Sequence, residues 1–297
     1  MIGNALLRVL LRRGWEVAGA TYHCHPSAAF RALDMQDALQ VSELLAELKP
    51  SLVAVPAANP YVDGCQLHPE ETRKVNVEGT LNVARACAKA RAKMIFYSSD
   101  YVFDGLKGTY NEEDAVCPIN EYGRQKAETE AGVLAASAGN LIIRTSGAYG
   151  WQWEPKNFVL QILRALGEGR EMRVASDLRY NPTYVENLAE VVADLASSGA
   201  SGIFHAVGAE KISRVDFARL AARVFVLDES LIKPVPIAEF GSPTPRPKET
   251  SLDTRKVRAS VATALWGPRQ GLEHMKTFEA EWRAYAGEHL PSKIIKP

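Results

Sequence analysis

Apolar residues in this chain occur in short continuous runs that alternate with longer segments of helical periodicity. The short runs predict buried strands at residues 16–21, 51–55, 93–97, 141–145 and 203–207. The periodic segments, several bounded by Gly or Pro, predict helices at 2–13, 37–48, 69–92 and 213–226, with others around Tyr122 and after Val185. Strands and helices that alternate at this spacing predict an α/β fold with a doubly wound parallel sheet.

The alternation stops after Gly150, where Pro, Trp and longer loops take its place. We expect residues 1–150 to form a larger domain and a smaller C-terminal lobe to follow it. The helix and strand at 185–210 resume the earlier pattern and are expected to return to the larger domain. The smaller lobe would then consist of residues 151–184 and 211–297, and a chain of this length can bury a sizeable core.

The composition narrows the class of protein. The 297 residues include 35 basic and 35 acidic side chains, and this balance argues against nucleic acid or a membrane surface as the main partner. No apolar run reaches about 18 residues, and arginines interrupt the opening segment, so neither a membrane span nor a signal peptide is predicted.

The cysteines and histidines give no sign of a metal site. The four cysteines are scattered without a Cys-x-x-Cys pair, which fits a reduced cytoplasm. Cys87 falls in an Ala-rich helix, where we expect a buried free thiol. His23 and His25 have no Cys or carboxylate partner nearby in the sequence, so we expect no metal there.

A Tyr and a Lys with a spacing that suits carbonyl chemistry follow the 93–97 strand. Tyr122 and Lys126 are four residues apart, so on a helix they lie one turn apart on the same face. An ammonium held beside a phenol favours the phenolate, and Tyr122 is therefore predicted to exchange a proton near neutral pH. A hydroxyl of Ser98 or Ser99 can bind the same reacting oxygen. These groups would suit the reduction of a carbonyl by a hydride donor.

Several strings resemble the extended short-chain dehydrogenase/reductases, and most closely their dTDP-4-dehydrorhamnose reductase branch. The strongest matches are Tyr-Ser-Ser-Asp-Tyr-Val-Phe-Asp-Gly at 97–105 and Tyr-Gly-Arg-Gln-Lys at 122–126. Further matches are Ala57-Ala58, Asn76-Val77-Glu78-Gly79-Thr80, Arg144-Thr145-Ser146, Asn181-Pro182-Thr183-Tyr184-Val185 and the segment 246–254. They follow the family's order over nearly the whole chain.

The resemblance implies roles for the central residues. Tyr122 would be the general acid that protonates a ketone oxygen, and Lys126 would lower its pKa and bind the nicotinamide ribose. Ser99 would hold the substrate oxygen, with Asp100 beside it, and Asn76 would support the site. Residues 1–150 with 185–210 would then be the dinucleotide-binding domain, and the smaller lobe would bind the substrate.

The resemblance also implies which residues contact the dinucleotide. The loop Ala57-Ala58-Asn59 would run along the ribose and nicotinamide, with Tyr97 nearby, where a doubly wound sheet binds its ligands. Asp34 and Met35 would lie at the adenine, unless Asp34 only precedes the helix at 37–48. Ile2 and Gly3 match the end of the family's glycine turn.

The choice of cofactor depends on the residues after the 16–21 strand. This segment has no acidic residue to bind a ribose 2′-hydroxyl, as NAD enzymes usually do. His23, His25 and Arg31 would instead suit a 2′-phosphate. We therefore expect NADP, with NAD as the alternative.

By resemblance, the substrate is a nucleotide-linked 4-keto-6-deoxy sugar of dTDP-rhamnose biosynthesis. Arg246 and Lys248 would pair with its diphosphate, although an ordinary basic surface loop explains them equally well. Gly147 stands where the rhamnose branch carries a Trp against the sugar, and Trp151 and Trp153 lie close by in the sequence. The identity of the sugar therefore stays open.

The start of the chain departs from the family. The family's fold opens with a central strand and a Gly-x-x-Gly-x-x-Gly turn, whereas Met1-Ile2-Gly3 matches only the end of that turn. A missing central strand would leave buried backbone groups unpaired at a cost of about 1–3 kcal/mol each. A start site placed too late, a degraded copy or another segment in the gap would explain the difference. We expect the chain as written to bind dinucleotide poorly.

Two other functions stay open. The 98–105 string also resembles the regulatory β subunit of methionine adenosyltransferase, which keeps the reductase fold but serves as a binding partner. A sugar-nucleotide epimerase of the same superfamily would retain tightly bound NAD. Ser99, Tyr122 and Lys126 favour the reductase, because a scaffold needs no tuned phenol. We expect a cytoplasmic protein, for which a homodimer is left open.

Overall fold

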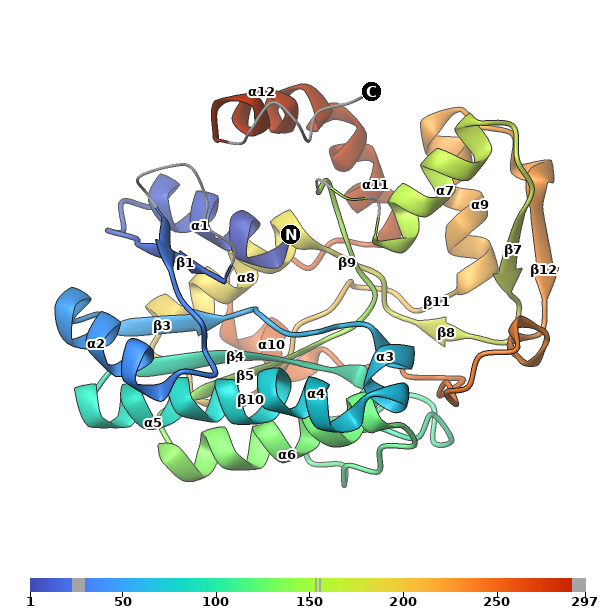
Figure 1. Ribbon diagram of the computed structural model, residues 1–297. Coiled ribbons are helices and arrows are strands. Elements are labelled where there is room, and N and C mark those ends of the chain that lie inside the picture. The colour runs from blue at the N-terminus through green and yellow to red at the C-terminus, as the bar shows by residue number, and fades with distance from the viewer. Residues whose placement is uncertain (23–29, 153, 155, 290–297) are drawn as a thin grey trace.

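Four strands of the described chain form a parallel sheet with helices on both faces (Figure 1). The computed structural model describes residues 1–22, 30–152, 154 and 156–289. The main sheet has the order β10-β5-β4-β3, and its strands are β3 (Leu52–Val55), β4 (Lys93–Ser99), β5 (Leu141–Thr145) and β10 (Gly202–His205). All neighbouring strands of this sheet are parallel, which confirms the predicted α/β class with a parallel sheet.

Alternate residues of the central strands are buried on opposite faces of the sheet. On β4, Ile95 and Tyr97 join one apolar core, whereas Met94 and Phe96 join another. The first core lies against α1 (Ile2–Arg12) and α8 (Val185–Ser197). The second lies against α2 (Ala38–Leu48), α5 (Thr80–Ala90) and α6 (Glu121–Ala136). Burial on both faces explains why the 93–97 segment is apolar without interruption.

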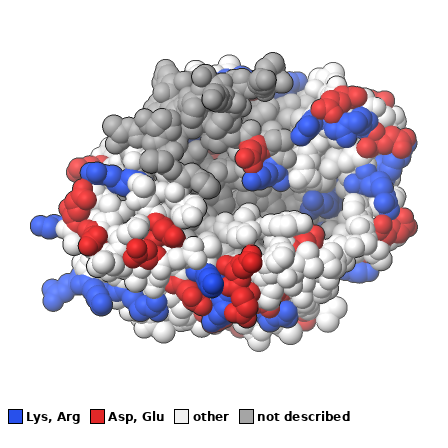
Figure 2. Space-filling model, viewed as in Figure 1, with Lys and Arg blue, Asp and Glu red and all other residues white. Residues whose placement is uncertain are grey.

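Charged side chains fasten α1 to α8 at the edge of the first core. Arg8 pairs with Glu186, Arg12 pairs with Glu190, and Arg13 donates to Asp194 at 2.8 Å. On the face of the molecule in Figure 2, acidic and basic side chains are interspersed. This mixture agrees with the balanced composition.

The helix predicted at 69–92 is continuous but changes its winding. It consists of α4 (Pro69–Arg73), a π-helical turn at Lys74–Gly79 and α5, and it follows the short α3 (Val62–Leu67). Single π turns within helices are rare and often lie at functional sites. This one carries the buried Asn76.

The main sheet does not continue into the first two strands of the chain. β1 (Gly19–Thr21) pairs in parallel with β2 (Phe30–Ala32) as a separate ladder. No strand in the described part of the chain pairs with the second edge of β3. The strand predicted at 16–21 is thus shorter than expected, and β2 is not predicted by the pattern. His23, Cys24 and His25 lie outside the described residues.

A smaller lobe of short strands and helices lies beside the main sheet (Figure 1). Its ladders are β7 (Met172–Ala175) with β12 (Ile232–Val235), β8 (Arg179–Tyr180) with β11 (Ile212–Ser213), and β6 (Ala148–Tyr149) with β9 (Thr183–Tyr184). Its helices are α7 (Phe158–Gly167), α9 (Arg214–Phe225) and α11 (Pro268–Thr277), followed by α12 (Glu279–His289). Short 3₁₀ turns lie at Glu229–Leu231 and Ile237–Phe240. The lobe has its own apolar core around Tyr149, Phe217 and Leu272.

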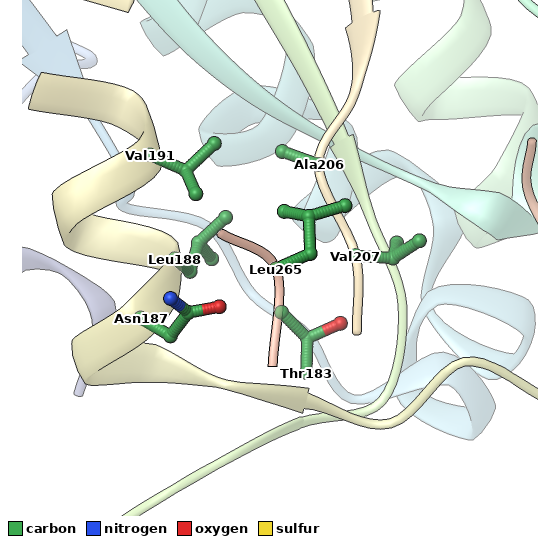
Figure 3. A pocket seen from close by; sticks show the side chains of 7 residues that line it. All are labelled: Thr183, Asn187, Leu188, Val191, Ala206, Val207 and Leu265. Carbon is green, nitrogen blue, oxygen red and sulfur yellow. The ribbon is translucent and has the colours of Figure 1, made fainter. Parts of the chain in front are cut away.

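Two later segments return to the main sheet. β10 pairs with β5, so the strand predicted at 203–207 extends this sheet. The short helix α10 (Arg255–Ser260) contributes Val257 to the core around α1 and α8, and Leu265 follows it there. Residues 255–265 are expected in the smaller lobe and pack instead against α8. Figure 3 shows Leu265 between α8 and Ala206. The gap that these side chains line is too small for a water molecule.

A buried ion pair connects α6 with β5. Arg144 donates two hydrogen bonds to the carboxylate of Glu130, at 2.9 and 2.7 Å, and both side chains are almost fully buried. The guanidinium also lies 5.1 Å from the centre of the Phe103 ring and 3.4 Å from Nε2 of His205 on β10. Burial and the charge of Arg144 lower the pKa of His205 to about 3, so this imidazole is neutral.

Replacing Arg144 with Met should lower the free energy of unfolding by about 3–5 kcal/mol, because Glu130 would keep a buried charge without its partner. Urea unfolding followed by circular dichroism measures the change. The double variant Arg144→Met/Glu130→Leu buries neither charge and should recover most of the loss. A double variant as unstable as the single one would contradict this explanation.

Candidate active site

Three neighbouring strands end at the same edge of the main sheet, and small or polar residues follow each of them. β3 is followed by the loop 56–59, β4 ends in Ser98 and Ser99, and β5 is followed by Ser146. The carboxyl ends of parallel strands lie side by side, and doubly wound proteins bind their ligands at this edge. Candidate residues from distant parts of the sequence thus come together.

Asp100 is a buried carboxylate that three hydroxyl groups bind. Ser99 donates to its Oδ1 at 2.9 Å, Ser146 donates to its Oδ2 at 2.7 Å, and Thr250 also donates to Oδ2. Burial raises the pKa of Asp100, and these hydrogen bonds oppose the rise. The carboxylate therefore joins the ends of β4 and β5 to the loop that contains Thr250.

The first turn of α6 lies against the 3₁₀ turn Asp100–Val102 that follows β4. Asn120 caps the helix, because its side chain accepts a hydrogen bond from the Gly123 amide at 2.9 Å. A Cβ atom at Gly123 would lie 2.1 Å from the carbonyl oxygen of Tyr101, so this close approach requires glycine. The rings of Tyr101 and Tyr122 meet edge to face, with centroids 6.1 Å apart.

Lys126 lies one turn further along α6, and its side chain is buried. Its Nζ donates to the carbonyl oxygen of Tyr97 at 2.8 Å and lies 5.8 Å from the centre of the Tyr122 ring. Burial lowers the pKa of Lys126 to about 8, and the carboxylate of Glu130 opposes the change. Tyr122 and Lys126 thus share one face of the helix, as their spacing predicts.

The pKa of Tyr122 differs from the sequence-based expectation. Burial raises the pKa of the phenol, the nearby Asp100 raises it further, and the Ser99 hydroxyl opposes the rise. The prediction that Lys126 brings this pKa toward neutrality is wrong for this structure, because burial of the phenol outweighs the interactions that oppose the rise. Tyr122 is therefore a protonated phenol beside the Ser99 hydroxyl, which is the form that a general acid requires.

Asn76 ties the loop after β3 to α6. Its Oδ1 accepts a hydrogen bond from the Asn59 amide at 2.7 Å, and its Nδ2 donates to Oε1 of Gln125 at 2.9 Å. Gln125 also donates to Oγ1 of Thr72 at 3.0 Å. No pattern in the sequence distinguishes Gln125 as a site residue, because only its contacts reveal its role. Together these amides position the loop 57–59 relative to Tyr122 and Lys126.

The residues expected near the pyrophosphate and adenine lie close to this edge of the sheet or beside α5. Gly3, in the first turn of α1, comes close to Pro56, whose ring carbon would lie 3.1 Å from a Cβ at this glycine. Met35 packs against Gly79 at the end of the π turn, where a Cβ would lie 3.2 Å from it. Asp34 accepts a hydrogen bond from the Gln36 amide at 2.9 Å. Ile2 is half-buried at the start of α1.

Tyr97 contributes its backbone rather than its phenol. Its ring packs in the core that α1 and α8 cover, and its hydroxyl is buried with no hydrogen-bond partner in the described part of the chain. Burial raises the pKa of this phenol. Its carbonyl oxygen binds Lys126 and so places the amine at the end of β4.

Arg246 and Lys248, expected at a diphosphate, are both paired with carboxylates. Arg246 donates to Asp63 at 2.8 Å, and Lys248 lies 3.0 Å from Asp177. Ser242 also donates to Asp63 at 2.8 Å. These contacts join α3, just after the loop 57–59, to the loop of residues 242–250. Arg246 therefore links two segments around the candidate site.

Gly147 leaves room for an aromatic ring from another strand. Its φ is +50°, and a Cβ at this position would lie 2.2 Å from the Tyr180 ring. Tyr180 therefore occupies the space of a side chain at 147. In the sequence, only the glycine at 147 hints that another residue fills this space. Trp151 instead donates to the Met275 carbonyl at 2.7 Å in the smaller lobe, and Trp153 lies outside the described residues.

The described residues contain neither a candidate metal site nor a candidate membrane-spanning helix. No group of His, Cys, Asp and Glu side chains among residues 1–22, 30–152, 154 and 156–289 could hold a metal ion. Within the same ranges no helix has the length and apolar character to span a bilayer. Cys87 is a buried free thiol, as predicted, and burial raises its pKa to about 12.

The pKa of Lys126 predicts how stability depends on pH. Its folded-state pKa of about 8 lies below the ordinary 10.5, so the unfolded chain binds more protons between these values. The stability of the wild type relative to Lys126→Met should therefore increase as the pH rises from about 8 toward 10.5. Urea unfolding of both proteins across this range measures the difference. A difference that is independent of pH would contradict the burial of the amine.

Known proteins resemble this chain over most of its length. The RmlD substrate binding domain family matches residues 1–279. The dTDP-4-dehydrorhamnose reductase of Mycobacterium tuberculosis is 35% identical over 230 residues, which cover 71% of this chain and 75% of that protein. The methionine adenosyltransferase 2 subunit beta of Xenopus tropicalis is 29% identical over 284 residues, which cover 90% of this chain and 84% of that protein.

A solved structure has the same fold. The dTDP-4-dehydrorhamnose reductase of Bacillus anthracis in complex with NADP superimposes with a TM-score of 0.85 and is 26% identical. The superposition covers 93% of this chain and 95% of that protein. The family match extends over almost the whole chain, so the chain belongs to the RmlD substrate binding domain family.

Proposed function

We propose that this chain reduces a nucleotide-linked 4-keto-6-deoxy sugar, such as dTDP-4-dehydrorhamnose, with NADPH. The observation that carries the proposal is the convergence of Ser99, Tyr122 and Lys126 at the carboxyl end of β4. Family membership and the names of the relatives support the substrate class. Neither the geometry of these three residues nor family membership identifies the sugar.

In the proposed reaction Tyr122 gives its phenolic proton to the carbonyl oxygen while a hydride adds to the carbonyl carbon, so a ketone becomes an alcohol. NADPH, when bound, supplies the hydride. The Ser99 hydroxyl lies beside Tyr122 and would hold the carbonyl oxygen. Lys126 is mostly an ammonium at neutral pH, since its pKa is about 8, and it would stabilise the phenolate that forms.

The residues around Lys126 suit the nicotinamide end of the dinucleotide. Lys126 presents an amine at the end of β4, and the loop after β3 carries the small Ala57 and Ala58. Asn76 fixes this loop through Asn59. Small side chains at a strand end let a ligand approach the backbone closely, so these residues would border the ribose and nicotinamide.

The residues for the other end of the dinucleotide are fewer. Ile2 and Gly3 would lie at the pyrophosphate, and Asp34 and Met35 would lie at the adenine. Arg31, expected at a 2′-phosphate, pairs with Glu47 at 2.9 Å on the surface. We retain NADP as the proposed cofactor, with NAD as the alternative, because the B. anthracis relative is named in complex with NADP.

We also propose a division of labour between the two parts of the chain. Residues 1–150 and 185–210 would bind the dinucleotide, and the pairing of β10 with β5 supports the inclusion of the second segment. Residues 151–184 and 211–297 would bind the substrate, apart from 255–265, which pack against α8.

Tyr122→Phe should lower kcat for the reduction of dTDP-4-dehydrorhamnose by about 10²–10⁴-fold, because phenylalanine has no proton to donate. The loss of NADPH absorbance measures the rate. Tyr110→Phe is a matched control, since its hydroxyl binds Asp104 outside the candidate site, and it should keep most of the activity. Equal rates for wild type and Tyr122→Phe would contradict the role of Tyr122.

The protein should bind NADPH more tightly than NADH, in keeping with the relative that is named in complex with NADP. A fluorescence titration with each dinucleotide measures the two affinities. Tighter binding of NADH would contradict the preference for NADP.

A noncatalytic role is the second candidate, and the similarity to the methionine adenosyltransferase 2 subunit beta over 90% of this chain favours it. A stable complex with a methionine adenosyltransferase, together with no turnover by the wild type, would support this role. Retention of NAD without net oxidation of NADPH would instead indicate an epimerase.

A further inference from the structure

Two guanidinium groups lie near the phenols of the candidate site, and they differ in their partners. Arg246 donates to Asp63 at 2.8 Å, so one of its edges is engaged. Arg214, the first residue of α9, stacks on the ring of Phe158, with its Cζ 3.9 Å from the ring centre. No carboxylate among the described residues pairs with Arg214. Its half-buried guanidinium keeps its donors for another partner.

The β8–β11 ladder places Arg214 next to Tyr180. Ile212 on β11 pairs with Tyr180 on β8, and the Arg214 amide donates to the Leu178 carbonyl at 2.9 Å. Burial raises the pKa of Tyr180 to about 12, and the charge of Arg214 is the main effect that opposes the rise. Arg214 thus directly follows the strand that pairs with Tyr180, and the Tyr180 ring packs against Gly147, next to Ser146 of the candidate site.

The same charge also acts on the other side of the site. Burial and Asp100 raise the pKa of Tyr101, whereas Arg246 and Arg214 oppose the rise. Tyr101 contacts Tyr122 directly through the edge-to-face pair. Arg214 belongs to the smaller lobe, where α9 and β11 lie in Figure 1, yet it is among the charges that lower the pKa of Tyr101, which lies just after β4.

We propose that Arg214 binds a phosphate group of the substrate, a nucleoside diphosphate linked to a sugar, with the hydroxyl of Tyr180 beside it. This inference rests on the proposed function and assigns the phosphate to a different residue from Arg246. A guanidinium offers two parallel N–H donors that match a phosphate, and Phe158 holds this one in place. Arg246 has already given a donor to Asp63.

The test is the binding of dTDP to the full chain, measured by isothermal titration calorimetry without any dinucleotide. Arg214→Gln should weaken dTDP binding roughly 10- to 100-fold, because it removes a charge-assisted pair of hydrogen bonds. The dTDP affinity of Arg214→Lys should fall between those of the wild type and Arg214→Gln, since lysine keeps the charge but loses the planar pair of donors. Arg219→Gln, on the same helix, is the matched control and should bind dTDP like the wild type. Circular dichroism and thermal melting establish that each variant is folded.

Thymidine serves as the uncharged probe, and its binding should not change in Arg214→Gln. Unchanged dTDP affinity in folded Arg214→Gln would overturn the inference and leave the proposed function standing. Equal losses for dTDP and thymidine would also overturn it, because they would indicate a disturbed nucleoside site rather than a lost phosphate contact. A wild type that binds no dTDP would contradict the nucleotide-sugar function itself, and the inference with it.

Discussion

The carboxylate of Asp100 is the interaction on which the candidate site depends. Ser99, Ser146 and Thr250 donate hydroxyl hydrogen bonds to it from the ends of two neighbouring strands and from a distant loop. Such a buried carboxyl group is tolerated only because these donors replace water. The same carboxylate keeps the Ser99 hydroxyl at the end of β4 and raises the pKa of Tyr122. Asp100 thus both connects the strand ends and influences the pKa of the phenol at Tyr122.

Lys126, Glu130 and Arg144 form a connected group of charged side chains on α6 and β5. Lys126 is held by a backbone carbonyl, and the carboxylate of Glu130 supports its charge. Glu130 is in turn held by Arg144, whose other neighbour is the neutral His205 on β10. The strand that returns late in the sequence therefore contributes to the surroundings of an amine on α6. Satisfied polar networks of this kind favour a single arrangement of a core.

The smaller lobe contacts the main sheet through side chains as well as through the chain itself. Arg246 and Asp63 join the loop of residues 242–250 to α3, and Tyr180 fills the space beside Gly147. Tyr180 and Arg214 come from one short ladder, so the lobe presents a phenol and a cation together. In the proposed function, charges of the lobe that binds the substrate also act on Tyr101, whose ring packs against the reacting phenol of Tyr122.

The pattern of the sequence determined the elements that local rules control. The apolar run at 93–97 becomes the doubly buried β4, Asp37 caps α2, and Tyr122 and Lys126 share one face of α6. Spacing, capping and periodicity act between residues close in the chain, so they can be recognised without a structure. The order of the motifs along the chain likewise identified the family.

Only the tertiary structure decided how far each group is removed from water and which distant groups meet. Burial raises the pKa of Tyr122 against the expected direction, Asn76 finds Gln125, and Arg246 pairs with Asp63 while Arg214 stays free of carboxylates in the described chain. The tertiary structure also decided that β1 does not pair with β3 and that residues 255–265 pack against α8. Desolvation and long-range pairing depend on the packing of the whole chain, and no local pattern encodes them.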